Sequence, residues 1–173
     1  MKQEILFVLL DHFADWEGAY IAPNLNWGVE PGSESRYVVK TVSVTKGFVV
    51  SCGGFKVLPD YTINDIPADY AGVVLIGGMS WFTPGAELVV PLVEDAIRNK
   101  KLVAGICNAS VFLGMHGFLN EVNHTSNGLD YLKEYGGAGY KGECHYVTRC
   151  RQPHIEARMH RYGIGCGSAF RGQ

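Results

Sequence analysis

The chain has 173 residues, of which 47% are hydrophobic and 18% are charged, and its formal net charge is −2 at pH 7. This composition favours one compact α/β domain over two domains or a disordered chain. The nearly balanced charge gives no electrostatic basis for binding nucleic acid or an anionic membrane, so we expect neither partner.

The first residues and the cysteines indicate a cytoplasmic protein. The short apolar segment near the N-terminus lacks the length and the small-residue cleavage site of a secretory signal, and no apolar run approaches a bilayer span. The five cysteines are odd in number and scattered, which favours reduced thiols over a disulfide framework.

The first half of the chain predicts strands with intervening turns. Ile5 to Leu10 is a continuous apolar run, typical of a central parallel strand, and a helix that begins near Asp15 places Glu17 close to the end of that strand. Further expected elements are a strand over Tyr37 to Val44, a hairpin of Phe48 to Cys52 with Phe55 to Leu58, a short helix within Asp60 to Asp69, and a strand over Ala71 to Ile76 that ends in Gly77-Gly78.

The second half predicts alternating helix and strand. Gly85 to Lys100 has apolar residues at helical spacing, and Leu102 to Ile106 is a buried strand followed at once by a helical pattern. Thr125 or Ser126 is expected to cap a short helix that ends at Gly136-Gly137. The order predicts a doubly wound, mostly parallel sheet with helices on both faces, a three-layer sandwich.

Cys107 lies at the sharp turn between the strand Leu102 to Ile106 and the next helix. Such a turn is the thiol version of a nucleophile elbow, and Gly105, Ala109 and Ser110 are small enough to allow it. The start of a helix lowers a thiol pKa, so this position favours reactivity. The alternative is that Cys107 packs in the core as a small hydrophobic residue.

Three motifs in this order, ADWEGA, LIGGMSW and AGICNAS, resemble the ThiJ/PfpI family of the class I glutamine-amidotransferase-like superfamily. The resemblance covers Lys2 to about Val147. It implies a flavodoxin-like α/β fold and a homodimer that acts on a small-molecule substrate, with no metal or organic cofactor.

The resemblance also implies roles for single residues. Cys107 would be the nucleophile, Glu17 the acid that hydrogen-bonds its sulfur, and the backbone N–H groups of Gly78 and Asn108 the oxyanion hole. Without the resemblance, Glu17 is an ordinary first-turn helix acid and Gly77-Gly78 a simple turn. Trp81 and Phe82, which follow directly, would wall the pocket or belong to a dimer contact.

The catalytic base departs from the family pattern. Many relatives have a histidine directly after the nucleophile, where this chain has Asn108, and others close a Thr-Thr-His-like segment with histidine, where this chain has Asn127. His124, three residues earlier, is a candidate displaced base, with support from Asn127, or a loop histidine with only a structural role. We expect His116 to be structural.

The last segment, residues 149–173, differs from the preceding domain, residues 1–148. It contains five arginines, two histidines and one acid, and no strand is recognisable in it. A basic tail that binds nucleic acid is one interpretation. We favour another, a shift of the reading frame, because with suitable codons a one-base shift encodes a strand, a glycine turn and an amphipathic helix.

The spacing of Cys144, His145, Cys150 and His154 lacks the close pairs of zinc sites, so we treat it as accidental and expect no metal.

The predicted function is that of a cysteine-dependent hydrolase or amidase, or a glyoxalase- or deglycase-like enzyme, acting on a small carbonyl or amide through Cys107. The missing histidine weakens the hydrolase interpretation, because thiol acyl transfer needs a base at the leaving group. The alternatives are a non-enzymatic redox sensor or stress-protective chaperone of the same fold, and an inactive truncated member.

Overall fold

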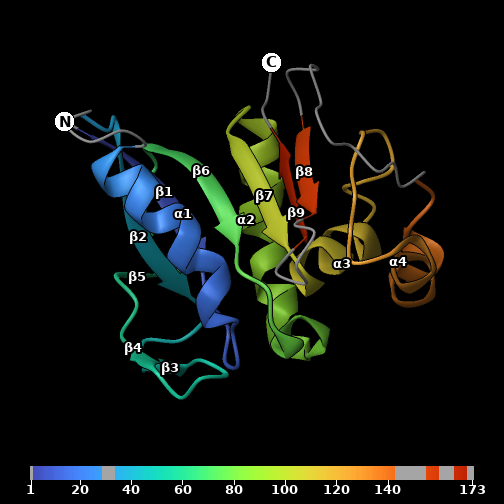
Figure 1. The fold of residues 1–173 in the computed structure, drawn as a ribbon, viewed down its shortest axis with the longest axis horizontal. Helices are drawn as coiled ribbons and strands as arrows, with labels where there is room; N and C mark the ends of the chain where they lie inside the picture. The colour runs from blue at the N-terminus through green and yellow to red at the C-terminus, as the bar shows by residue number, and fades with distance from the viewer. Residues whose placement is uncertain (1, 29–33, 143–154, 160–165, 171–173) are drawn as a thin grey trace.

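The computed structural model describes residues 2–28, 34–142, 155–159 and 166–170. Within them, a seven-stranded sheet has the order β5-β2-β1-β6-β7-β9-β8. The first five strands of this order are parallel to one another (Figure 1). At the far edge, β9 is antiparallel to β7, and β8 is antiparallel to β9. Their bounds are β1 Gln3–Val8, β2 Tyr37–Ser43, β5 Tyr61–Thr62, β6 Tyr70–Leu75, β7 Leu102–Ile106, β8 Ile155–Met159 and β9 Cys166–Phe170. The doubly wound, flavodoxin-like fold is confirmed.

Helices cover both faces of this sheet because its central strands are apolar on both sides. In β1, Ile5 and Phe7 face α1 (Asp15–Trp27), whereas Leu6 and Val8 belong to the core beneath α2 (Val90–Arg98) and α3 (Asn108–Met115). Figure 1 shows α1 in front of β1 and β2, with α2 behind the sheet. This is the expected three-layer sandwich.

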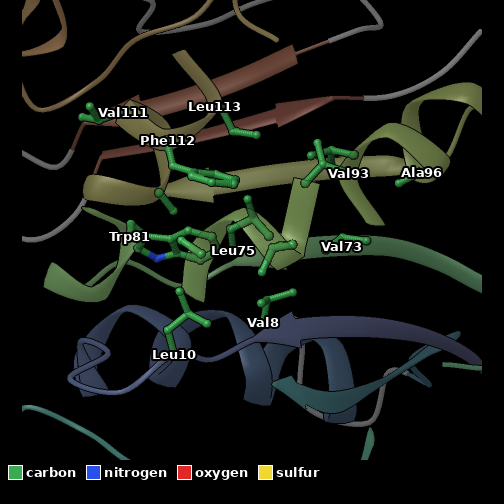
Figure 2. Packing of buried hydrophobic residues seen from close by; sticks show 14 of the residues in the cluster. Val8, Leu10, Val73, Leu75, Trp81, Val93, Ala96, Val111, Phe112 and Leu113 are labelled. Atoms are coloured by element: carbon green, nitrogen blue, oxygen red, sulfur yellow. The ribbon is translucent and has the colours of Figure 1, made fainter. Parts of the chain in front are cut away.

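The larger core lies on the side of α2 and α3. Figure 2 shows Trp81 among Leu10, Leu75 and Phe112. The Trp81 indole N–H donates to the Ile76 carbonyl at 2.6 Å, and the Trp81 and Phe112 ring centroids are 4.8 Å apart. Trp81 is 1% exposed and therefore a core residue, so the expectation that it walls a pocket or a dimer contact is wrong.

Several local elements differ from the expectation. The segment 60–69 forms strand β5 and a turn in place of a short helix, because the Asp65 carboxylate accepts the backbone N–H and the hydroxyl of Thr62. The segment expected as one helix begins as the 3-10 helix η2 (Pro84–Val89), which passes into α2 where Pro91 occupies the first turn. The hairpin is confirmed as β3 (Val49–Val50) and β4 (Lys56–Val57).

Two strands lie within the segment 149–173, where the sequence predicted none. Strand β9 pairs with β7 and β8 pairs with β9, both antiparallel. Pairing with an exposed sheet edge needs only backbone N–H and C=O groups, so a segment without a strand pattern can still extend a sheet. The cluster of Cys144, His145, Cys150 and His154 lies outside the described residues, and the proposed shift of the reading frame stays a prediction.

The remaining described elements are short. They are the 3-10 helix η1 (Met79–Phe82), the helix α4 (Leu129–Gly136) and the 3-10 helix η3 (Gly137–Gly139). No helix among the described residues is long and apolar enough to cross a membrane.

Candidate active site

Cys107 occupies a strained turn between β7 and α3. Its backbone angles are φ 54° and ψ −124°, in a region that non-glycine residues rarely adopt. The turn requires the strand and the helix to lie close together, and a Cβ at Gly105 would be 2.8 Å from Leu113 Cδ1 and 3.2 Å from the Ala109 backbone. The expected elbow geometry is therefore present.

Glu17 lies beside this cysteine. It comes from the first turn of α1, is only 5% exposed, and its Oε2 accepts the Gly77 backbone N–H at 2.6 Å. Gly77 separates the two side chains, because a Cβ there would lie 2.5 Å from Glu17 Oε2 and 2.7 Å from Cys107 Cβ. Burial raises the pKa of Glu17 to about 7, although hydrogen bonds from Gly77 and from the Cys107 thiol act in the opposite direction.

The pKa of the Cys107 thiol is raised, whereas the sequence predicted a lowered pKa. Burial raises its pKa, and the charge of Glu17 raises it further, whereas hydrogen bonds from Asn127 and from the Asn108 backbone lower it. Desolvation therefore outweighs the helix N-terminus. Both groups therefore resist ionisation, and the pKa of the thiol lies above its ordinary value.

One amide side chain contacts the sulfur, and a second amide lies beside the first. Asn127 Nδ2 is 3.3 Å from Cys107 Sγ and 3.5 Å from Asn108 Oδ1. Asn108 Nδ2 donates to the Gly78 carbonyl at 3.2 Å, and the Tyr131 hydroxyl donates to Asn108 Oδ1 at 3.1 Å. Five residues from four segments thus form one hydrogen-bonded group, of which Tyr131 was not a sequence candidate.

His124 is placed differently from the other candidates. It is fully buried, with Nδ1 at 2.7 Å from the Val122 carbonyl and Nε2 at 2.8 Å from the Tyr140 hydroxyl. These two contacts connect it to its own loop and to Tyr140, and neither leads to Cys107. Its role as a base remains a prediction, and its surroundings favour the structural alternative.

The loop that carries Asn127 is attached to the elbow helix. Ser126 and Ser110 pair through their hydroxyls at 2.7 Å, and the Ser110 hydroxyl donates to the Cys107 carbonyl at 2.6 Å. The predicted capping role of Thr125 or Ser126 is wrong, because α4 begins after Gly128 without a side-chain cap. Both residues are buried instead.

Comparison of the sequence with known protein families identifies the family of this chain. The model of the DJ-1/PfpI family matches residues 3–151. The chain belongs to the DJ-1/PfpI family. Its resemblance to ThiJ/PfpI proteins is thereby confirmed.

Two relatives of this DJ-1/PfpI protein come from Bacillus subtilis. One, named "Uncharacterized protease YdeA", is 38% identical over 133 residues, which cover 77% of this chain and 64% of the relative. The other, named "Uncharacterized protease YoaZ", is 31% identical over 150 residues, covering 84% of this chain and 70% of the relative. The chain therefore spans less than two thirds of the length of YdeA.

Solved structures of the family share the fold. The DJ-1 superfamily protein Atu0886 from Agrobacterium tumefaciens is 35% identical with a TM-score of 0.71, covering 89% of this chain and 77% of that one. A thiJ/pfpI family protein from Bacillus anthracis is 26% identical with a TM-score of 0.74, and the match covers 82% of this chain and 68% of that one.

The described contacts of His116 and Phe82 in this DJ-1/PfpI chain are with residues other than Cys107 and Glu17. His116 packs against Phe112, with ring centroids 4.6 Å apart, and its Nε2 is 3.4 Å from Glu87, in agreement with a structural role. Phe82 packs against Tyr135 at 5.3 Å. In the part of the chain that the structure describes, no group of three or more histidine, cysteine or acidic side chains could hold a metal ion.

Proposed function

We propose that this protein is a cysteine-dependent enzyme that acts on small carbonyl compounds, in the manner of a glyoxalase, a deglycase or a hydrolase. The observation that supports it most is the placement of Cys107 on a strained elbow with the Glu17 carboxyl against its sulfur. The protease names of YdeA and YoaZ are consistent with hydrolase-like chemistry.

The proton transfer is assigned to Glu17. Its pKa of about 7 allows it both to accept and to return a proton near neutral pH. In the proposed step the Cys107 S–H bond breaks, the proton moves to the Glu17 carboxylate, and the sulfur electron pair forms a bond to the carbonyl carbon. The carbonyl π electrons move to oxygen, which then takes the proton from Glu17 to give a hemithioacetal.

The oxyanion is assigned to the backbone N–H groups of Gly78 and Asn108. The hydrogen bond between the Asn108 side chain and the Gly78 carbonyl brings the two residues together beside the sulfur. Backbone donors fixed in this way stabilise negative charge that develops on a substrate oxygen.

Aldehydes suit this site better than amides. Addition to an aldehyde, the first step of its turnover, needs only one proton to be moved and returned, which Glu17 can do alone. Amide hydrolysis also needs a proton for the departing amine and activation of a water, and the described contacts of Cys107 include no histidine. We therefore place aldehyde substrates before amides.

Turnover of glyoxal and of a small amide tests the proposal. We expect Cys107→Ala to lose at least about a hundredfold in kcat/KM for glyoxal. Cys52→Ser is the matched control, because Cys52 is exposed and hydrogen-bonds Asp15, and it should retain the activity. Equal turnover by wild type and Cys107→Ala would refute the proposal.

Mass spectrometry of Cys107 after mild peroxide treatment distinguishes the redox sensor from the enzyme and from an inactive member. A sensor shows reversible oxidation of Cys107 without turnover, whereas an inactive member shows neither. The raised pKa of the Cys107 thiol weighs against the sensor, since oxidation requires the thiolate, whereas in the proposed enzyme Glu17 takes the thiol proton as the new bond forms.

We also propose the homodimer that the resemblance implies. Trp16, Tyr20 and Trp27 are exposed on α1, and these apolar side chains are available to a contact between two copies. Light scattering during gel filtration measures the mass, and a monomer at all concentrations contradicts the proposal.

A further inference from the structure

The side chain of Asn127 is exposed, and yet its Nδ2 contacts the Cys107 sulfur. An exposed asparagine normally samples several rotamers, so a fixed contact needs another partner. The structure provides one in Asn108, whose Oδ1 is 3.5 Å from Asn127 Nδ2 and accepts the Tyr131 hydroxyl at 3.1 Å.

The orientation of both amides follows from one backbone group. The Gly78 carbonyl can only accept a hydrogen bond, so the Asn108 side chain must direct its Nδ2 to Gly78. Its Oδ1 then faces Tyr131 and Asn127. Because Oδ1 can only accept, Asn127 must present its Nδ2, and this same nitrogen is the atom 3.3 Å from the sulfur.

We propose that Tyr131 and the Asn108 side chain are positioning residues that fix the Asn127 amide with its N–H directed at the Cys107 sulfur. A donor in this position stabilises the thiolate and cannot remove the thiol proton, which leaves that proton to Glu17. The inference rests on the proposed function, in which Cys107 is the reacting group.

Two further features support this role for Tyr131. Burial raises the pKa of its hydroxyl, with smaller contributions from Tyr135 and from the nearby Cys107, so the hydroxyl is protonated and a donor at neutral pH. The loop is also held at the residue before Asn127, where Ser126 pairs with Ser110 of the elbow helix. The backbone of this loop is therefore fixed independently of the Asn127 side chain.

The pH dependence of Cys107 alkylation by iodoacetamide tests the proposal, with the Cys107 peptide quantified by mass spectrometry because Cys52 is exposed and also reacts. We expect Asn127→Ala to raise the pH of half-maximal alkylation by about one unit, since a donor to the thiolate is lost. Asn127→Asp should raise it further, because a charged acceptor of similar size replaces the donor.

The deciding variant is Tyr131→Phe, alone and combined with Asn127→Ala. Alone, it should raise the pH of half-maximal alkylation by about half a unit. In the double variant it should add nothing to the effect of Asn127→Ala, because Tyr131 acts through Asn127. Tyr135→Phe is the matched control, since its ring lies 4.5 Å from that of Tyr131 and its profile should equal that of wild type.

An unchanged profile for Tyr131→Phe, or an equal shift in both backgrounds, would overturn the proposal. Thermal unfolding of each variant confirms that alkylation is measured on folded protein. The readout is independent of turnover. If no substrate reacts but the shifts appear, the proposed function fails and the positioning role stands. If substrate is turned over but the profiles do not shift, the positioning role fails and the proposed function stands.

Discussion

Glu17 and Cys107 lie against each other across Gly77, whose missing side chain leaves the space in which carboxyl and thiol meet. The Gly77 N–H also fixes the carboxylate at 2.6 Å. The acid and the nucleophile, 90 residues apart in the sequence, therefore depend on one glycine between them.

Gly77→Ala is expected to separate this pair. The new Cβ would lie 2.5 Å from Glu17 Oε2, 2.7 Å from Cys107 Cβ and 2.7 Å from the Ile106 carbonyl oxygen, so both side chains and the adjacent β7 backbone must shift. We expect at least about a tenfold loss of kcat, because small displacements of reacting groups are costly. Gly47→Ala, where a Cβ would meet only the Thr45 hydroxyl at 3.6 Å and the backbone has no positive φ, controls for a general effect on the fold. Full activity of Gly77→Ala would contradict the arrangement.

Glu17→Gln should change thiol reactivity and turnover in opposite directions. The charge of Glu17 raises the Cys107 pKa, so the neutral amide should lower the pH at which Cys107 is alkylated. Turnover should fall by about a hundredfold or more, because glutamine cannot accept the thiol proton. The two measurements are iodoacetamide kinetics and glyoxal turnover. A parallel change in both would show that Glu17 does not transfer the proton.

The raised pKa of Glu17 also predicts a pH-dependent stability. Since the pKa is about 7 in the folded chain and ordinarily 4.5, the folded state binds this proton more tightly. The contribution is fully present below about pH 4.5 and is lost as the pH rises through 7. Relative to Glu17→Gln, wild type should lose up to about 3 kcal/mol of unfolding free energy between about pH 5 and about pH 8. Urea unfolding at both pH values measures it, and a constant difference would refute it.

His124→Phe distinguishes a structural histidine from a base. Its ring nitrogens contact the Val122 carbonyl and the Tyr140 hydroxyl in a fully buried site. We expect a loss of about 2 to 3 kcal/mol in unfolding free energy and an unchanged pH profile of Cys107 alkylation below the unfolding temperature. A loss of turnover in a variant that is still folded at the assay temperature would identify His124 as the base.

Trp81→Phe tests the core assignment. The indole N–H to Ile76 and the contact with Phe112 would be lost or weakened, with an expected cost of about 2 to 4 kcal/mol. Trp27→Phe, at a residue that is 79% exposed, should change the unfolding free energy by less than about 0.5 kcal/mol. Similar values for the two variants would contradict the buried placement.

Local patterns in the sequence were sufficient for the strands β1, β2, β6 and β7 and for the elbow. The alternation in β1, where Ile5 and Phe7 face one core and Leu6 and Val8 the other, follows from the strand period of two. The small Gly105, followed by Cys107 at the end of the strand, predicts a close strand-to-helix turn, and the contacts around Gly105 agree with it. These features depend on neighbouring residues, so the sequence alone determined them.

Only the tertiary structure decided the surroundings of the sulfur. Asn127 reaches Cys107 because Ser126 attaches its loop to α3, and Tyr131 reaches Asn108 from the first turn of α4, which begins at Leu129. The direction of the Cys107 pKa was also beyond the sequence, because it is a balance between desolvation and hydrogen bonds from segments distant in the chain. The pKa of Cys107 depends on how loops from distant parts of the chain pack around the sulfur, and the hydrophobic pattern of a single segment does not predict that packing.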